Sequence, residues 1–266
     1  MSNKRSDEHW LGLIIPGLIP FSHGNQIDKP ETLQYDQWLK AFGFSNIYTR
    51  TAEAYSGSDG LHTIESAYQT GTENALVQAA EELAQMGCDA LSWPCTCASF
   101  VGGLEWSQRQ VRALTKATGL PATSTSLAML EAVRHLGADV VDVVSPYPAA
   151  LTHRFLRFLD DAGINAAAMI SLDCIDETIS HRLDIFSTVI EFDKALSPRQ
   201  HPLLIPDTAV SAIGLIADLE ANIGRPVIAG NQATLWHSLR QLGHDSRITD
   251  AGTLMSGGQF NLRTRA

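Results

Sequence analysis

Short runs of apolar residues alternate along the chain with segments in which apolar residues recur every three or four positions. The first pattern is typical of buried parallel strands, and the second of helices that pack one face on a sheet. Strands are predicted at residues 11–15, 45–49, 90–93, 140–144, 166–170 and 203–205, and long helices at 73–86 and 149–161. This alternation indicates an α/β fold with parallel sheets.

The chain also contains an internal repeat. In each copy a predicted strand ends at a reactive side chain followed by threonine, Cys95-Thr96 in the first copy and Asp207-Thr208 in the second. A helix follows, then a Gly-x-Pro triplet that opens a short strand, and then a helix that ends at a glycine; the triplets are residues 119–121 and 224–226, and the final glycines are Gly137 and Gly243. Chance similarity between two βαβ segments is the alternative explanation.

A duplication predicts two pseudo-symmetric lobes, each a parallel sheet flanked by helices. The strand at 11–15 then corresponds to the strand at 140–144, since each begins its half and runs into a proline. We expect the first lobe to comprise residues 5–122 and 230–266, and the second to comprise residues 123–229. Cys95 and Asp207 would then face each other across one cleft.

Cys95 lies where a ligand site is expected, because ligands of open parallel sheets bind outside the carboxyl ends of the strands. Its thiolate would be both a nucleophile and a base, and the N-terminus of a helix near 99–105 would favour the negative charge. Gly102 and Gly103 would let the backbone approach a ligand in the same loop. The competing interpretation is a small, buried structural thiol, which is also our interpretation of Cys88 and Cys174.

Charge and composition limit the partners. The net charge of −10 and a pI near 5.3 oppose binding to nucleic acid and to anionic membranes. The polar N-terminus and the prolines that interrupt the apolar stretch at 11–21 predict a cytoplasmic protein without a membrane span. The cysteines have neither CxxC spacing nor a histidine pair at zinc-ligand spacing, so we expect reduced thiols and no metal.

Three segments carry a family resemblance. The stretch 90–103, with Cys95-Thr96, resembles the first catalytic-cysteine motif of maleate cis-trans isomerases and the equivalent loop of arylmalonate decarboxylases. The stretch 219–236 resembles the closing motif of the same two groups, and Val144-Ser145-Pro146-Tyr147 is similar to their tyrosine-bearing loop. The matches run in order from about 11 to 243, so the chain is identified as a member of this branch of the aspartate/glutamate racemase superfamily.

The resemblance implies a small carboxylate substrate, no metal or organic cofactor, and one reactive residue from each lobe. Members with two cysteines carry the second at the position of Asp207. Maleate isomerases tend to have an asparagine after the first strand, where this chain has Pro16-Gly17, as the decarboxylases do. Those decarboxylases, however, keep the second cysteine and lack the first, which is the reverse of this chain.

The remaining candidate residues follow from their positions. Asp207 is either an acid, with a pKa that would have to be raised, or a helix N-cap. Tyr147 would bind a substrate carboxylate, as the resemblance implies, and Thr96 and Thr208 would donate to a developing oxyanion. Pro16, Gly17 and Cys97 would form walls of the site. Asn231 and Gln232 are expected to cap the last helix, and no histidine is assigned to catalysis.

Four functions remain in competition. The first is a maleate-type isomerase, with Cys95 as nucleophile or base and Asp207 as the opposing acid. The second is a decarboxylase of substituted malonates, the third an amino-acid racemase, and the fourth a ligand-binding homologue without catalysis. The loops at 56–63 and 171–182 would set the pocket volume and so the choice of substrate. The sequence allows a homo-oligomer and does not fix its size.

Overall fold

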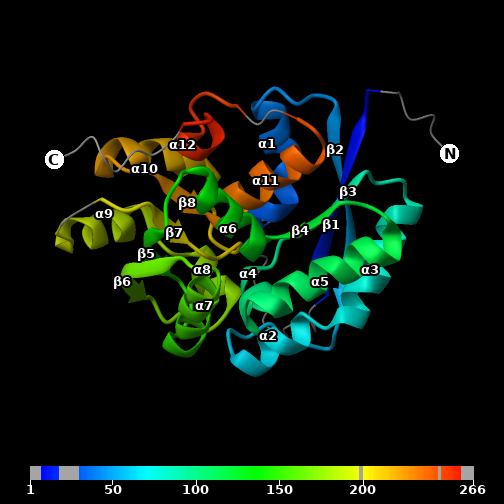
Figure 1. The fold of residues 1–266 in the computed structure, drawn as a ribbon, viewed down its shortest axis with the longest axis horizontal. Helices are drawn as coiled ribbons and strands as arrows, with labels where there is room; N and C mark the ends of the chain where they lie inside the picture. The colour runs from blue at the N-terminus through cyan, green and yellow to red at the C-terminus, as the bar shows by residue number, and fades with distance from the viewer. Residues whose placement is uncertain (1–6, 18–29, 198–199, 245–246, 259–266) are drawn as a thin grey trace.

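The computed structural model describes residues 7–17, 30–197, 200–244 and 247–258. Its strands form two parallel four-stranded sheets (Figure 1). The first sheet has the order β2-β1-β3-β4 and the second the order β6-β5-β7-β8. The strands of the first sheet are β1 (His9–Gly17), β2 (Ile47–Tyr55), β3 (Ala90–Trp93) and β4 (Ala122–Ser124); those of the second are β5 (Val140–Ser145), β6 (Asn165–Ser171), β7 (Leu203–Ile205) and β8 (Val227–Ala229). The predicted α/β class is confirmed, and the two sheets share one strand order.

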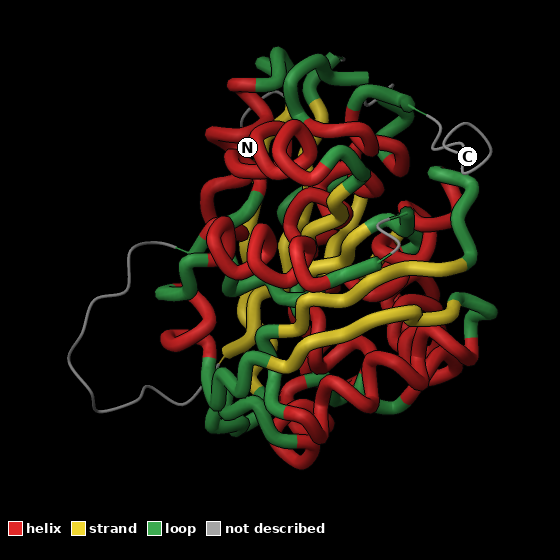
Figure 2. The backbone as a smooth tube through the Cα atoms, turned by 90° about the vertical axis from the view of Figure 1, so that its left-hand side faces the viewer, coloured by secondary structure: helices red, strands yellow, loops and turns green. Residues whose placement is uncertain are grey.

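Helices flank both sheets, and Figure 2 shows the strands lying between layers of helix. Between β1 and β5 the chain forms η1 (Glu31–Gln34), α1 (Tyr35–Ala41), α2 (Ile64–Thr70), α3 (Glu73–Gln85), α4 (Thr96–Phe100), α5 (Gly103–Thr118) and α6 (Thr125–His135). After β5 it forms α7 (Ala149–Asp161), α8 (Glu177–His181), α9 (Ile185–Ala195), η2 (Ile213–Leu215), α10 (Ile216–Ile223), α11 (Gly230–Gln241) and α12 (Gly252–Met255). Within the described ranges, no helix is both long and apolar enough to cross a membrane.

The repeat is visible in how two helices end. Gly119 ends α5 and Gly224 ends α10, each in the left-handed conformation, with φ of 73° and 72°. In each case the glycine N–H donates to the carbonyl of the residue four positions earlier. Glycine adopts this conformation without the steric cost that a Cβ would bring. Each Gly-x-Pro triplet therefore stops a helix and turns the chain into the fourth strand of its sheet.

Several elements are longer than the apolar pattern predicts, and β2 and α11 show why. The edge strand β2 pairs with β1 from Ile47 to Tyr55, but its exposed face carries polar side chains that break the apolar run. The helix α11 begins at Gly230, five residues before its first large apolar residue, Leu235. Its first turns are buried through small and polar side chains, which an apolar pattern does not reveal.

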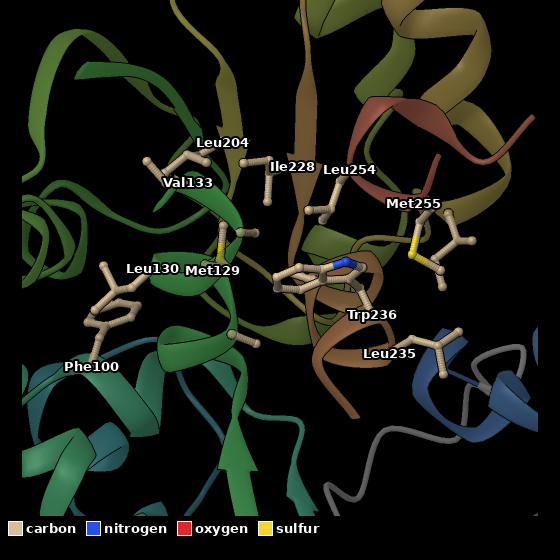
Figure 3. Packing of buried hydrophobic residues seen from close by; sticks show 14 of the residues in the cluster. Phe100, Met129, Leu130, Val133, Leu204, Ile228, Leu235, Trp236, Leu254 and Met255 are labelled. Carbon is tan, nitrogen blue, oxygen red and sulfur yellow. The ribbon is translucent and has the colours of Figure 1, made fainter. Parts of the chain in front are cut away.

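A single hydrophobic cluster includes buried residues from both sheets, among them Leu13 of β1 and Leu204 of β7. Figure 3 shows Trp236 of α11 packed between Met129 of α6 and the side chains of α12. The domain boundary expected at 122/123 falls within β4, which pairs with β3 in the first sheet. The assignment of residues 5–122 with 230–266 to one lobe, and of 123–229 to the other, stays a prediction.

A buried ion cluster fixes the second sheet, and it supports a prediction about stability. The Arg225 side chain is 1% exposed; it binds Asp142 of β5, and its Nε donates to Asp193 Oδ1 of α9 at 2.9 Å. Arg225→Met would leave two carboxylates buried without their cation, so we expect a loss of about 3–5 kcal/mol in the free energy of unfolding. Urea denaturation measures this loss.

The matched control for Arg225 is Arg134→Ala, which removes a half-exposed ion pair with Glu131 at 2.9 Å. Exposed pairs contribute up to about 1 kcal/mol. Equal losses in the two variants would contradict a structural role for the buried cluster.

Candidate active site

A cavity of about 480 Å³ opens at the carboxyl ends of β1, β3 and β7. Seven of the eight residues predicted as catalytic or substrate-binding line the cavity, namely Pro16, Cys95, Thr96, Cys97, Tyr147, Asp207 and Thr208, and Gly17 does not. Gly17 faces the neighbouring strand, where an added Cβ would lie 2.7 Å from the ring of Tyr55. Its missing side chain therefore makes room for Tyr55, which itself lines the cavity.

Cys95 follows β3 after one proline and occupies the N-cap position of α4. It is 8% exposed, and α4 begins at Thr96, several residues earlier than the helix expected near 99–105. Gly102 and Gly103 are not on the cavity wall; an added Cβ would meet the side chain of Trp106 at the first and of Asp161 at the second. The expectation that these glycines bring the backbone close to a ligand is therefore wrong.

The side chain of Cys97 lies against that of Cys95. A hydrogen bond between the two thiols, burial, and the charges of Cys95 and Asp207 together raise the pKa of Cys97 well above its ordinary value. The Cys97 thiol therefore keeps its proton near neutral pH and can donate it in a hydrogen bond to the sulfur of Cys95.

Asp207 follows β7 after one proline and is 4% exposed. Its Oδ1 accepts a hydrogen bond from the N–H of Ala209 at 2.9 Å, which closes a local turn. Because the next helical segment, η2, begins only at Ile213, Asp207 is not a helix N-cap, and that interpretation is wrong. Its Oδ2 is buried without a hydrogen-bond partner among the described residues, and this atom belongs to a side chain on the cavity wall.

The residue after Asp207 and the residue before Cys95 are hydrogen-bonded to each other. The Thr208 hydroxyl donates to the backbone carbonyl of Pro94 at 3.2 Å, so it joins the residue after Asp207 to the residue before Cys95. This bond fixes the two strand ends across the cavity. It also directs the Thr208 hydroxyl proton to the protein, whereas the sequence predicts a donor to an oxyanion.

Tyr147 is 1% exposed and lies at the cavity wall between two other rings. His62 packs edge-on to it with ring centroids 4.8 Å apart, and Phe100 does so at 5.7 Å. Burial and, after it, the charges of Asp207 and the two cysteines raise the pKa of Tyr147 well above its usual value, while the Thr96 hydroxyl acts in the opposite direction. Tyr147 is therefore a neutral phenol that can donate a hydrogen bond.

Among the wall residues that the sequence analysis did not assign are His62 and Glu177. They lie on the two loops expected to shape the pocket, and an antiparallel bridge between Leu61 and Asp176 joins these loops. The Nδ1 of His62 donates to the carbonyl of Cys174 at 2.8 Å, since a carbonyl can only accept. The tautomer of the neutral ring is therefore fixed. Only the fold brings residues this far apart in sequence together.

Glu177 is one of three carboxyl residues on the cavity wall, with Asp207 and Glu53. Desolvation and the charge of Asp207 raise its pKa, while His62 opposes the shift. The Glu177 carboxyl therefore keeps its proton to a higher pH than an exposed glutamate does. In the part of the chain that is described, no group of three or more His, Cys, Asp or Glu residues could hold a metal ion.

Comparison with known proteins places this geometry in a family. The sequence model of the arylmalonate decarboxylase family matches residues 45–255. A maleate isomerase of Geobacillus stearothermophilus is 27% identical over 183 residues, which cover 66% of this chain and 72% of the relative. An arylmalonate decarboxylase of Bordetella bronchiseptica is 26% identical over 171 residues, which cover 64% and 71%. These relatives are enzymes, an isomerase and a lyase.

Solved structures show the same fold. The maleate isomerase of Pseudomonas putida S16 superposes with a TM-score of 0.80 at 20% identity, covering 94% of this chain and 98% of its own. A cysteine-to-serine mutant of Nocardia farcinica maleate cis-trans isomerase, with a covalently bound succinylcysteine intermediate, gives 0.80 at 18% identity and covers 93% and 98%. The family match spans most of the sequence, and the chain belongs to the arylmalonate decarboxylase family.

Proposed function

We propose that this protein is a cofactor-independent isomerase of small carboxylates, of the maleate isomerase type, with Cys95 as the nucleophile or base and Asp207 as the opposing acid. The observation that carries the proposal is the placement of these two residues. They follow equivalent strands of two sheets with the same order and line one cavity. Addition of a nucleophile followed by transfer of a proton requires a reactive group on each side of the bound substrate.

The reaction begins at the Cys95 sulfur. The thiolate adds to one alkene carbon of a cis-dicarboxylate, and the π electrons move onto the other carbon and into its carboxylate. The central bond is then single and can rotate. Return of the electrons breaks the C–S bond and releases the trans product. Asp207, on the other wall, gives a proton to the carbanionic carbon and takes it back, and the protonated species is a succinyl thioether.

Neutral donors stabilise the charge that develops on the substrate carboxylate. Tyr147 holds one such proton, because its pKa is raised well above its ordinary value by burial. The first turn of α4, from Thr96, offers backbone N–H groups near Cys95. We assign the substrate carboxylate to this part of the wall. Small carboxylates are thus the expected partners, and the cytoplasmic location and oligomeric state stay predictions.

Decarboxylation of a substituted malonate is the second candidate, and the apolar wall favours it. Ile15, Pro16 and Leu33 line the same cavity. An apolar surface disfavours a bound carboxylate, so the bond to the α carbon can break, with carbon dioxide leaving and the electrons remaining as an enediolate. Cys95 would then protonate the α carbon. Amino-acid racemisation is less well matched, since it favours two bases of similar strength.

A substrate screen tests the proposal. Purified protein is incubated in D₂O with maleate, with phenylmalonate and with amino acids, and the products are followed by NMR. We expect conversion of maleate to the trans isomer. Release of carbon dioxide from phenylmalonate without maleate turnover would replace the isomerase by the decarboxylase. Turnover of none of them, with Cys95 labelling by iodoacetamide that maleate does not slow, would favour the non-catalytic homologue.

A further inference from the structure

Each of the two proposed reactive residues is followed by a threonine whose carbonyl binds a buried side chain. Ser126 Oγ donates to the carbonyl of Thr96 at 3.2 Å. Asn231 Nδ2 donates to the carbonyl of Thr208 at 2.9 Å. Both donor side chains belong to fully buried residues. The backbone next to Cys95 and the backbone next to Asp207 are therefore held in the same way.

The two donors occupy equivalent places in the repeat. Ser126 is the second residue of α6, which follows β4, and Asn231 is the second residue of α11, which follows β8. β4 and β8 are the fourth strands of sheets with the same order. The contact is thus made twice with side chains of different chemistry, a serine hydroxyl and an asparagine amide. An incidental packing contact has no reason to recur at the same place with a different side chain.

The backbone that carries Asp207 depends on this support. Residues 206–212 form neither helix nor strand between β7 and η2. Asn231 binds the segment near its start, at Thr208, and also donates to Glu31 Oε2 at 2.8 Å. Glu31 binds the far end, because its carboxylate accepts from the N–H of Ala212 at 3.2 Å and of Ile213 at 3.0 Å. Together the two side chains hold both ends of the segment.

Both the oxygen and the nitrogen of the Asn231 side-chain amide make hydrogen bonds. Its Oδ1 accepts from the Tyr35 hydroxyl at 3.0 Å, so the orientation of the amide is set and the Nδ2 protons point to Glu31 and Thr208. On the other side, the Thr96 carbonyl accepts a second bond, from Ser99 Oγ at 2.9 Å, and Ser99 also contacts Ser126. Both supports are therefore parts of buried polar networks, which rigidify a site when every member is satisfied.

We propose that Ser126 and Asn231 are a pseudo-symmetric pair of positioning residues that set Cys95 and Asp207, respectively, against a substrate between them. The inference rests on the proposed function, since it assigns a part in the reaction to each supported residue. Such a positioning role differs from a role in keeping the protein folded. A displacement of about 1 Å in a reacting group lowers a rate by roughly a hundredfold with little effect on the folded fraction.

The test compares Asn231→Ala, Ser126→Ala and the control Ser238→Ala. Ser238 is also buried on α11, and its hydroxyl donates to the Thr234 carbonyl at 2.7 Å, inside its own helix. The kcat per active site is measured with maleate or phenylmalonate, whichever the parent converts, and active sites are counted by iodoacetamide labelling. We expect both tested variants to lose at least about tenfold in kcat, and the control to stay within about twofold.

A second readout separates the two positions. Ser126→Ala should change the iodoacetamide rate of Cys95 by roughly threefold or more, while Asn231→Ala should leave that rate within about twofold. Asn231→Ala should instead speed amide hydrogen exchange at Ala212 and Ile213, relative to Ser238→Ala. Values of kcat per active site equal to that of the control in both variants would overturn the proposal.

Failure of the proposed function would look different. A parent protein that converts neither maleate nor phenylmalonate would refute the function, and the alkylation and exchange rates would then decide the positioning role. Equal rates in the tested variants and in Ser238→Ala would refute positioning as well.

Discussion

Cys95→Ala is expected to abolish turnover while leaving the protein folded. In the proposed reaction the sulfur forms the bond to substrate, and alanine has no group that can replace it. We expect kcat to fall by at least about a thousandfold. The fold should tolerate the change, because Cys95 lies at a strand end with extended backbone and its side chain makes no capping hydrogen bond. The loss of one buried sulfur should cost about 1 kcal/mol in the free energy of unfolding.

Cys88→Ala is the matched control for this prediction. Cys88 is 6% exposed, close to the 8% of Cys95, and it packs in the cluster between α3 and the first sheet, away from the cavity wall. The control should therefore show a similar stability change and parental turnover. Iodoacetamide should modify the parent quickly, Cys88→Ala equally quickly, and Cys95→Ala slowly. Turnover by Cys95→Ala on any substrate of the parent would remove Cys95 from the mechanism.

The apolar pattern predicts most of the fold, because central strands buried on both faces read as continuous apolar runs. Every residue of β3 and β7 is buried, and the predicted bounds of both strands match the structure. The edge strand β2 is half exposed, so its alternation of polar and apolar residues shortens the apparent strand. The start of α11 is hidden for another reason, because its buried side chains are polar and pair with distant residues.

The residues of the site also divide into those that the apolar pattern locates and those that it does not. Cys95, Tyr147 and Asp207 stand beside strand ends, so strand prediction leads directly to them. His62 and Glu177 reach the cavity from two segments that meet only in the folded chain. Asn231 illustrates the limit of local rules. An Asn at the start of a helix suggests a cap, yet its amide binds Thr208 and Glu31, and the helix cap is Ala229.

The second large prediction concerns the acid role proposed for Asp207. We expect Asp207→Asn to lower kcat by roughly a hundredfold or more. Asparagine keeps a side-chain oxygen that can accept the bond from Ala209, which closes the local turn. The free energy of unfolding should therefore change by at most about 1 kcal/mol. What asparagine cannot do is hold an exchangeable carboxyl proton at the position of Oδ2, the atom that is buried without a partner among the described residues.

Two further variants sharpen this result. Asp207→Cys restores the two-thiol arrangement that the family resemblance implies, so it should retain more activity than Asp207→Asn, though less than the parent because its side chain is shorter. Asp184→Asn is the control. Asp184 closes a similar local bond, from Ser187 N at 3.0 Å at the start of α9, on the protein surface and off the cavity wall. It should match the stability change of Asp207→Asn without its effect on kcat.

The decisive measurement for Asp207 is kcat on the true substrate across a pH series, with the parent, Asp207→Asn and Asp184→Asn side by side. A proton carried by Asp207 gives the parent a pH-dependent limb that asparagine removes, because an amide does not titrate in this range. A structural role leaves the limb in place and lowers only the folded fraction. A near-parental kcat in Asp207→Asn at every pH would exclude Asp207 as the acid. Cys95 would then be the only reactive group among those proposed here, and the proton would have to come from another wall residue such as the Cys97 thiol, the Tyr147 hydroxyl or the Glu177 carboxyl.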